Sequence, residues 1–346
     1  MIGRLATMLA AATLAASAAS AQQAPPKPLF ADQSMLRLTI TGPIAQVAQT
    51  GGANRQPRDA VLTVAGAVPE THPIQLSPRG ITRLKRGVCQ FSPLRVSFSQ
   101  VPGQQSLFSG QKSLKLVTHC RHSAAFQHHV LLEYAAYRLY NQLSPMSFRA
   151  RLATIDYVGS DGRPLTSRIG FFIEDVDDVA ARNALGRAPV GERALTSQLS
   201  RTDAARVAMF EYMIGNLDWS MRAGPQGDRC CHNARLIARA GATGNFVPVP
   251  YDFDFSGLVN APYAIAPDGQ SSVRVRRYRG YCTHNAEVLA MAGVFRSQRP
   301  QLLAVLDQVP LDQPARRRAA AYLEDFFSDI ADDQRVAAKL LKTCIQ

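Results

Sequence analysis

Two short acidic segments carry the side chains best suited to chemistry in this chain. Asp218 follows one apolar run, and Asp252 with Asp254 follows another, so these carboxylates are expected in loops. Asn233, directly after His232, lies between the two segments. Phosphoryl transfer needs one carboxylate to orient the acceptor hydroxyl, while another carboxylate and an asparagine hold the divalent ions that bridge the phosphates. We therefore expect Asp218 to be catalytic, with Mg²⁺ or Mn²⁺ held by Asp252, Asn233 and Asp254.

Basic side chains must meet the phosphates of a nucleotide from the other half of the molecule. In such sites a lysine on a strand is held by a glutamate on a helix. Lys115 lies in a strand-like run and Glu133 in the helix-like segment that follows, so they are the best-placed pair, with Lys112 as the substitute lysine. Arg79 and Arg83 are further candidates for phosphate contacts, although both are equally compatible with surface charges in a turn. ATP or another nucleotide is the expected cofactor.

Each acidic candidate also has a purely structural explanation. Asp252 and Asp254 can satisfy backbone N–H groups of the turn that follows them. Asp218 can end a helix over the indole of Trp219, the one tryptophan in the sequence. Glu133 can be a solvated residue of its helix. For the aspartates the functional interpretation is preferred, because the segments follow one another in the order that phosphoryl transfer requires.

The elements that position these residues change along the chain from strands to helices. Alternating apolar residues and Gly or Pro boundaries predict strands over residues 36–40, 60–64, 94–98, 114–117, 151–158 and 169–173, with one prominent helix over 126–143. From Thr202 the pattern is mostly helical, with a strand pair near 234–237 and 246–249 and later helices that start at Asp312 and Asp332. The predicted fold is α+β and two-lobed, with a β-rich N-lobe containing one main helix over 35–175 and an α-rich C-lobe over 176–346.

Taken together, these segments resemble the spore-coat CotH kinases, a family of secreted or surface proteins with an atypical protein-kinase-like fold. The resemblance covers most of the chain and rests on Arg79-Gly80-x-x-Arg83, on Asp218-Trp219 followed by His232-Asn233, and on Tyr251-Asp252-Phe253-Asp254. It implies a kinase-like fold in which Asp218 is the catalytic aspartate and Asp252 the metal-binding one. The chain departs from ordinary kinases because it has no G-x-G-x-x-G loop and no H-R-D triplet, and because 15 positions separate Asp218 from Asn233.

The amino-terminal residues predict export. Arg4 precedes an apolar run over residues 5–18, and Ala19-Ser20-Ala21 then forms an A-x-A cleavage site, so residues 1–21 are expected to be a signal peptide. Residues 22–34, with several prolines, are expected to be a flexible lead-in. The apolar run is shorter than the about 20 residues that a spanning helix needs, and charges interrupt every later one, so no membrane span is expected. The mature protein is predicted to be periplasmic or secreted.

Composition adds two constraints. The chain carries 39 Lys and Arg against 26 Asp and Glu, a formal net charge of +13, and removal of the signal with Arg4 leaves +12. Such an excess suits phosphates or anionic surfaces. The six cysteines are even in number and bound for an oxidising compartment, which favours disulfides over zinc sites. Cys89 and Cys120 flank strands of the same lobe and are expected to pair.

The expected partners are a nucleotide and a protein substrate in the cell envelope, phosphorylated on Ser or Thr. A basic run, Arg274 to Arg279, can dock an acidic substrate segment, but its alternation with apolar residues favours a charged edge strand. One short basic strand in an exported protein does not indicate a nucleic-acid partner. Two other functions stay open: a non-catalytic, pseudokinase-like binding module of the envelope, and a metal-dependent hydrolase that uses Asp218, Asp252, Asp254 and His232.

If the signal is cleaved as expected, the mature protein begins at Gln22. The intact mass of the exported material tests this, because retention of residues 1–21 adds their full mass to the product. A soluble exported product that still carries these residues contradicts the cleavage prediction.

Overall fold

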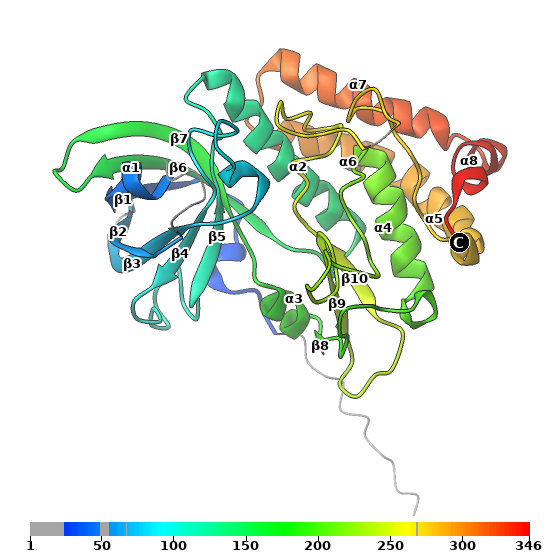
Figure 1. The fold of residues 1–346 in the computed structure, drawn as a ribbon, viewed down its shortest axis with the longest axis horizontal. Coiled ribbons are helices and arrows are strands. Elements are labelled where there is room, and N and C mark those ends of the chain that lie inside the picture. Colours follow the sequence, from blue (N-terminus) through cyan, green and yellow to red (C-terminus); the bar gives the residue numbers. More distant parts are fainter. Residues whose placement is uncertain (1–23, 49–54, 67, 268) are drawn as a thin grey trace, which may run out of the picture.

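The computed structural model describes residues 24–48, 55–66, 68–267 and 269–346, so the predicted signal peptide lies outside the described residues. The fold is α+β, with a large closed sheet at one end and a group of helices at the other (Figure 1). The closed sheet is a barrel with the strand order β1-β2-β3-β4-β5-β7-β6, in which only the pairing of β1 with β6 is parallel. The strands are β1 Leu36–Gly42, β2 Arg58–Val64, β3 Glu70–Pro78, β4 Leu94–Phe98, β5 Ser113–Val117, β6 Ala150–Gly159 and β7 Pro164–Ile173.

Apolar side chains fill the inside of the barrel, because successive residues of a strand point to opposite faces. In β5, Leu114 and Leu116 are buried in the barrel core, and Lys115 between them therefore lies on the outer face. This core is separate from the apolar core among the helices. The alternation thus leaves Lys115 available to the part of the molecule that packs against the barrel.

The segment before the barrel is packed, in contrast to the flexible lead-in predicted over residues 22–34. Pro28–Phe30 form a short 3₁₀ helix whose last two residues are buried. The guanidinium of Arg151 in β6 donates a hydrogen bond to the carboxylate of Asp32 at 2.9 Å. Apolar burial and one buried cation therefore fix this segment, neither of which its proline content indicated.

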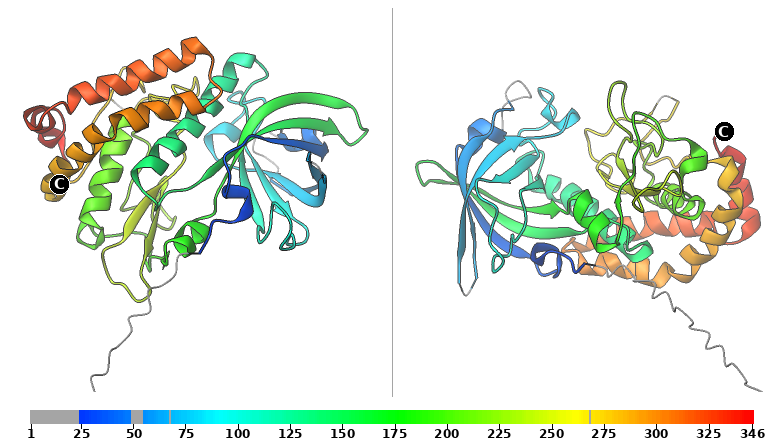
Figure 2. Two further views of the ribbon diagram at one scale, coloured as in Figure 1. Left: turned by 180° about the vertical axis from the view of Figure 1, so that it is seen from behind. Right: turned by 90° about the horizontal axis from the view of Figure 1, so that it is seen from below.

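Of the eight α-helices in the described residues, six follow the barrel, and they pack around a second core. Helix α2 lies between the barrel and the other helices, as two further views show (Figure 2). It packs on β6 and β7 and shares its buried residues with the core that α4, α5 and α7 form. The helices are α1 Ile44–Ala48, α2 Gln127–Leu143, α3 Val176–Arg182, α4 Arg201–Ile214, α5 Asn285–Ser297, α6 Arg299–Ala304, α7 Gln313–Asp329 and α8 Asp333–Lys339.

A small antiparallel sheet in the helical part supports two of the predicted site segments. Its order is β10-β9-β8, and its strands are β8 Gly186–Arg187, β9 Ala234–Ala238 and β10 Val247–Pro250. Asn233 directly precedes β9, and Asp252 follows β10 by two residues. Because β9 and β10 are antiparallel neighbours, the start of one and the end of the other lie at the same edge.

Helix α4 leads directly into the loop that carries Asp218. Ser200 caps its first turn through a hydrogen bond from the backbone N–H of Asp203, and Gly215 ends it with φ +66°. A Cβ atom at Gly215 would lie 2.0 Å from the hydroxyl of Tyr322, so no larger residue fits there. The helix therefore stops at a defined point, and Asp218 follows in the loop.

The edge strand predicted through the basic run does not form, and residues 273–279 are irregular. Arg276 donates to the carbonyl of Met213 at 3.2 Å, and Arg279 donates to the carbonyl of Leu217. These carbonyls belong to the end of α4 and the residues after it, where helical acceptors lack partners. These two arginines therefore bind the backbone around the end of α4, and the prediction of a charged edge strand is wrong.

The residues after this basic segment are fastened to the carboxyl end of the chain. Cys282 and Cys344 form a disulfide, with their Cα atoms 5.0 Å apart. The N–H of Ile345 donates to the carbonyl of Gly280, and the N–H of Cys282 donates to the carbonyl of Ile345, both at 2.9 Å. The carboxyl end and the segment that ends at Gly280 are therefore held as one unit.

The predicted disulfide between Cys89 and Cys120 is confirmed, with an S–S distance of 2.03 Å. The other four cysteines pair as Cys282–Cys344 and as Cys230–Cys231, both in the helical part. Three disulfides are compatible with an extracellular or periplasmic protein. None of the helices within the described ranges is long and apolar enough to cross a membrane.

Removal of either long-range disulfide is expected to destabilise the protein by several kcal/mol. The Cys89–Cys120 pair closes a separation of 31 residues and the Cys282–Cys344 pair one of 62. Loop-closure entropy gives about 3.5 kcal/mol for the first and about 4 kcal/mol for the second, as losses in the free energy of unfolding. Urea unfolding of the paired Cys→Ala variants measures both, and an unchanged midpoint in either variant contradicts the expectation.

Candidate active site

A cavity of about 640 Å³ lies between the barrel and the helical part. Its walls come from the chain after β3, from α2, from the loop after α4 and from the segment after β10. Seven of the site residues predicted from the sequence line it: Arg79, Arg83, Glu133, Asp218, Asn233, Asp252 and Asp254. Segments that are far apart in the sequence therefore meet at one place.

Asp218 is held at the cavity by two side chains from the far arm of its own loop. Nε2 of His232 lies 2.8 Å from Oδ1 of Asp218, and the amide nitrogen of Asn233 donates to Oδ2 at 3.0 Å. The hydrogen bond to Asp218 raises the pKa of His232 above its ordinary value, because it stabilises the charged imidazolium. The Asp218 side chain is 41% exposed, so the carboxylate is oriented by its neighbours and still accessible from the cavity.

Backbone hydrogen bonds close the loop between Asp218 and Asn233 at its base. The N–H of Ser220 donates to the carbonyl of His232 at 2.9 Å, and the N–H of His232 donates to the carbonyl of Ala223 at 3.0 Å. The chain therefore leaves the cavity after Asp218 and returns beside it. This closure explains how the two residues meet across a spacing much longer than that of an ordinary kinase catalytic loop.

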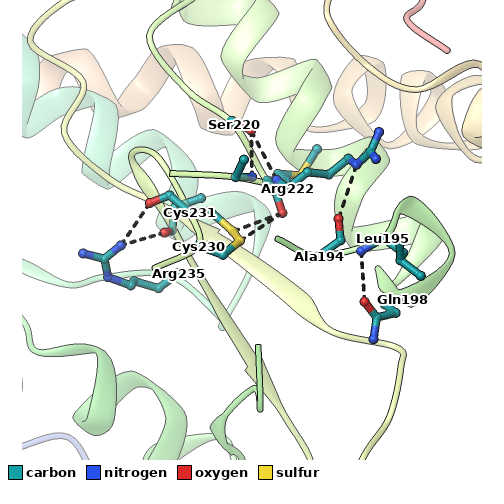
Figure 3. The surroundings of a disulfide bond; sticks show 11 residues. Ala194, Leu195, Gln198, Ser220, Arg222, Cys230, Cys231 and Arg235 are labelled. Carbon is teal, nitrogen blue, oxygen red and sulfur yellow. Dashed lines mark hydrogen bonds between the residues drawn. A yellow bond between two sulfur atoms is a disulfide. The ribbon is translucent and has the colours of Figure 1, made fainter. Parts of the chain in front are cut away.

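A disulfide between the adjacent residues Cys230 and Cys231 lies on the returning arm of this loop (Figure 3). Sγ of Cys231 is 3.1 Å from the carbonyl oxygen of Met221 on the outgoing arm. The guanidinium of Arg235 donates to the carbonyl of Cys231 at 3.1 Å. The residues directly before His232 are thus in contact with both the outgoing arm and β9.

Two of the predicted metal ligands have an unusual backbone conformation. Asn233 has φ 49° and Asp252 has φ 67°, in the left-handed region that residues other than glycine rarely adopt. The N–H of Tyr251 donates to the carbonyl of Asn233 at 3.0 Å, and the N–H of Asp252 donates to the hydroxyl of Tyr137 at 3.0 Å. Strained residues of this kind concentrate at functional sites, where the surrounding contacts hold them in place.

Carboxyl groups crowd the inner end of the cavity. Glu133 is 3% and Asp254 is 8% exposed. Burial, followed by the negative charges of neighbouring aspartates, raises the pKa of both, that of Asp254 to about 7. Arg83 is buried with them, and although burial opposes it, the surrounding Tyr263, Asp254 and Glu133 raise the pKa of its guanidinium. More negative than positive groups therefore meet at this point.

Three side chains at this end of the cavity carry oxygen atoms of the kind that a divalent cation uses as ligands. Asn233 uses its amide nitrogen on Asp218, which leaves its Oδ1 for a metal, and Asp252 and Asp254 supply carboxylate oxygens. Oxygen donors of this kind are the ligands that Mg²⁺ and Mn²⁺ prefer. The described residues contain no group of three or more His, Cys, Asp or Glu side chains arranged to hold a metal ion. Phosphate oxygens would complete the shell, as is usual for Mg²⁺.

Lys115 does not form the predicted ion pair with Glu133, because no contact within 4 Å joins the two side chains in the described part of the chain. Among the cations, the charge of Arg83 acts most strongly on Glu133. Instead, Nζ of Lys115 lies 4.6 Å from the centre of the Tyr251 ring. The guanidinium of Arg235 lies 4.9 Å from the same ring. A cation on an aromatic face is a stabilising contact, and here one aromatic side chain receives two of them.

Arg79, Arg235 and Tyr251 line the cavity, and Lys115 adds a third positive charge through its contact with the Tyr251 ring. Burial, followed by the charge of Arg79, lowers the pKa of Lys115 to about 8, and the charge of Arg235 acts in the same direction. Three like charges this close favour an anion between them. We call the group of Arg79, Lys115 and Arg235 the cationic wall.

Two important residues were not among the site residues predicted for phosphoryl transfer. From the sequence, His232 is a candidate for the alternative hydrolase centre and part of the His232-Asn233 motif, but no contact with Asp218 is expected. Arg235 is not predicted as a site residue, although it is the one charged residue in the apolar run Ala234–Ala238. A charged residue inside a short, otherwise buried strand is a signal that can be read from the sequence.

The comparisons do not assign the chain to a family. No protein-family model matches it, and no curated protein matches it either. The resemblance to the spore-coat CotH kinases therefore stays a prediction, and the function must be inferred from the geometry and charges of the cavity.

Binding of a polyphosphate to the cationic wall should weaken as the pH rises through about 8. Below that pH Lys115 is charged, and its ammonium adds to the attraction of Arg79 and Arg235; above it the lysine becomes neutral and this contribution is lost. Calorimetric titration of tripolyphosphate between pH 6.5 and 9.5 measures the change, which is expected to reach about tenfold in affinity, since a charge-assisted hydrogen bond contributes about 1.5–3 kcal/mol.

The Lys115→Met variant is expected to bind tripolyphosphate about tenfold more weakly at pH 7 and to lose the step near pH 8. Lys112→Met is the matched control, because Lys112 is exposed and, unlike Lys115, is not one of the two cations over the Tyr251 ring. Equal losses in the two variants, or a step that survives in Lys115→Met, would show that Lys115 does not contact the phosphates.

Proposed function

We propose that the chain is an exported, kinase-like phosphotransferase that moves a phosphoryl group from ATP or another nucleotide to a Ser or Thr hydroxyl of an envelope protein. The observation that carries this proposal is the arrangement around Asp218. Its carboxylate is oriented by His232 and Asn233, and it lines the same cavity as the carboxylates of Asp252 and Asp254 and as Arg79 and Arg235 of the cationic wall. One oriented carboxylate, one set of metal ligands and one anion site are what phosphoryl transfer requires.

The metal would be Mg²⁺ or Mn²⁺, held by Asp252, Asp254 and the Oδ1 atom of Asn233. When bound, such an ion neutralises the negative charge of the phosphate oxygens. Burial, and after it the negative charge of Asp252, raises the pKa of Asp254, and a bound cation would relieve that repulsion. The cationic wall would hold the remaining phosphate oxygens, and Arg79 would be its contribution from the chain after β3.

Asp218 would accept a hydrogen bond from the acceptor hydroxyl and turn its oxygen toward the phosphate. Asn233 fixes the carboxylate through Oδ2, and His232 fixes it through Oδ1. The raised pKa of His232 keeps its imidazolium charged to a higher pH than usual, so that a cation adjoins the carboxylate of Asp218 over a wider pH range. Orientation rather than covalent chemistry would be the contribution of these side chains.

The order of elements supports the kinase-like part of the proposal. Lys115 lies on β5 and Glu133 on the following α2, Asp218 follows α4, Asn233 precedes β9, and Asp252 follows β10. Proteins of the kinase class use a lysine, a glutamate, an aspartate, an asparagine and a second aspartate in the same order. The difference is that Arg83, and not Lys115, accompanies the helical glutamate.

Substitution of the two key aspartates should separate binding from transfer. Nucleotide with Mn²⁺ at about 100 times its dissociation constant is expected to stabilise the wild type by about 2.7 kcal/mol, a shift of several degrees in Tm. Asp218→Asn should keep this shift and lose the transfer of labelled γ-phosphate to an envelope extract, because it removes only the orientation of the hydroxyl. Asp252→Asn should lose both.

Asp325→Asn is the matched control for these variants, because Asp325 is exposed on α7 and lies outside the cavity. It is expected to behave as the wild type in both measurements. A wild type that shows neither stabilisation nor transfer with any nucleotide and metal would refute the phosphotransferase and favour a binding module. Metal-dependent stabilisation without nucleotide, together with ester hydrolysis, would favour the hydrolase.

A further inference from the structure

A second cavity, of about 440 Å³, opens on the other side of Asp218. Asp218 and Phe255 line both cavities, so the catalytic carboxylate lies on the boundary between them. The other lining residues are mostly apolar or backbone: Gly215, Leu217, Ile265, Ala266, Pro267 and Val273. We call this cavity the groove. It offers neither a cluster of carboxylates nor a group of arginines, so it differs in chemistry from the first cavity.

The floor of the groove is rigid because two glycines allow three segments to approach closely. The N–H of Gly257 donates to the carbonyl of Gly215 at 3.0 Å. A Cβ atom on Gly257 would lie 2.7 Å from the carbonyl oxygen of Val273, and on either glycine it would also strike the hydroxyl of Tyr322. The backbone beside Asp218 is therefore packed directly against the start of the basic segment.

One wall of the groove presents an apolar side chain to solvent. Ile265 is 70% exposed, an unusual position for a large aliphatic side chain. Phe255 on the neighbouring segment is partly exposed as well. Burial of such surface by a partner is favourable, at about 25 cal/mol for each Å² of apolar area. The groove therefore favours an apolar group on its occupant.

Basic residues adjoin two parts of the lining of the groove. Val273 is followed in the chain by Arg274, which is exposed and donates to the carbonyl of Gly257 at 3.4 Å, and by Arg277, which is exposed and has no ion-pair partner among the described residues. Ile265 also lines a smaller cavity of about 240 Å³ with Lys85 and Arg121. The basic run does not form an edge strand, so its exposed charges have no explanation as protection of a sheet edge. They favour an acidic occupant of the groove.

We propose that the groove binds the acceptor as an extended acidic peptide, with the Ser or Thr hydroxyl at Asp218 and a neighbouring apolar side chain against Ile265. This inference rests on the proposed phosphotransferase and names the class of its substrate. In the reaction the hydroxyl oxygen forms a bond to the terminal phosphorus, and the bond from that phosphorus to the bridging oxygen of the nucleotide breaks. The nucleoside diphosphate leaves, and the hydroxyl proton passes to Asp218.

Equilibrium binding of labelled peptides tests the groove separately from catalysis. The probe is fluorescein-labelled Glu-Glu-Leu-Ser-Leu-Glu-Glu, which places an apolar residue on each side of the serine and so does not depend on the direction of the chain. Fluorescence anisotropy with the full-length mature protein is expected to show at least tenfold tighter binding than with an analogue whose leucines are asparagines. An analogue whose glutamates are lysines is expected to bind at least tenfold more weakly.

Two surface variants locate the peptide on the protein. Ile265→Asp and Arg277→Glu are each expected to weaken binding of the probe at least fivefold. Arg277→Glu is also expected to reduce the difference in affinity between the probe and the analogue whose glutamates are lysines. Leu165→Asp and Arg239→Glu are the matched controls, because both residues are exposed and lie outside the residues that line the groove. The Tm of all four variants without any ligand should match that of the wild type, which verifies that they are folded.

The outcomes distinguish the groove from the phosphotransferase. Equal binding of the three peptides, equal effects of the surface variants and their controls, or tighter binding of a labelled heptathymidylate than of the probe would overturn the acceptor groove, even if γ-phosphate transfer to other proteins occurs. Selective peptide binding that Ile265→Asp abolishes, in a protein that transfers no phosphate, would support the groove as a peptide site and reject the enzyme.

Discussion

The buried group of Arg83, Glu133 and Asp254 is the constraint on which the rest of the structure depends. Its members come from the chain after β3, from α2 and from the segment after β10, so the group joins the barrel to the helical part. Carboxyl and guanidinium groups removed from water are costly to bury unless their neighbours compensate them. A displacement of any one of the three segments would therefore change the electrostatic environment of the buried groups on the other two.

A series of hydrogen bonds links α2 to Asp218 at the cavity and positions the residues between them. The hydroxyl of Tyr137 on α2 accepts from the backbone of Asp252, and the adjacent Tyr251 donates to the carbonyl of Asn233. Asn233 in turn holds the carboxylate of Asp218. The left-handed conformations of Asn233 and Asp252 are tolerated because each lies within this chain. Asp218, although partly exposed, is therefore positioned by the same packing that buries Glu133.

Features that depend on local sequence could be predicted, and those that depend on long-range packing could not. Asp312 and Asp332 start helices as expected, each accepting a hydrogen bond from the backbone three residues later. The strand that contains Lys115 could also be predicted, but the contact of Lys115 with Tyr251 could not. Closure of the barrel turns the outer face of β5 toward Tyr251, and Arg83 from a different segment is the cation whose charge acts most strongly on Glu133. The pairing of His232 with Asp218 depends on how a long loop closes, which spacing does not reveal.

The fastening of the carboxyl end has a consequence for how the protein can be handled. Cys344 and Ile345 hold Gly280 and Cys282 through one disulfide and two backbone hydrogen bonds, and the segment that ends at Gly280 begins with Val273 in the groove. Trimming of the last three residues by a carboxypeptidase removes all three links. An affinity tag placed directly after Gln346 lies one residue from this junction, whereas a tag placed before the barrel leaves it untouched.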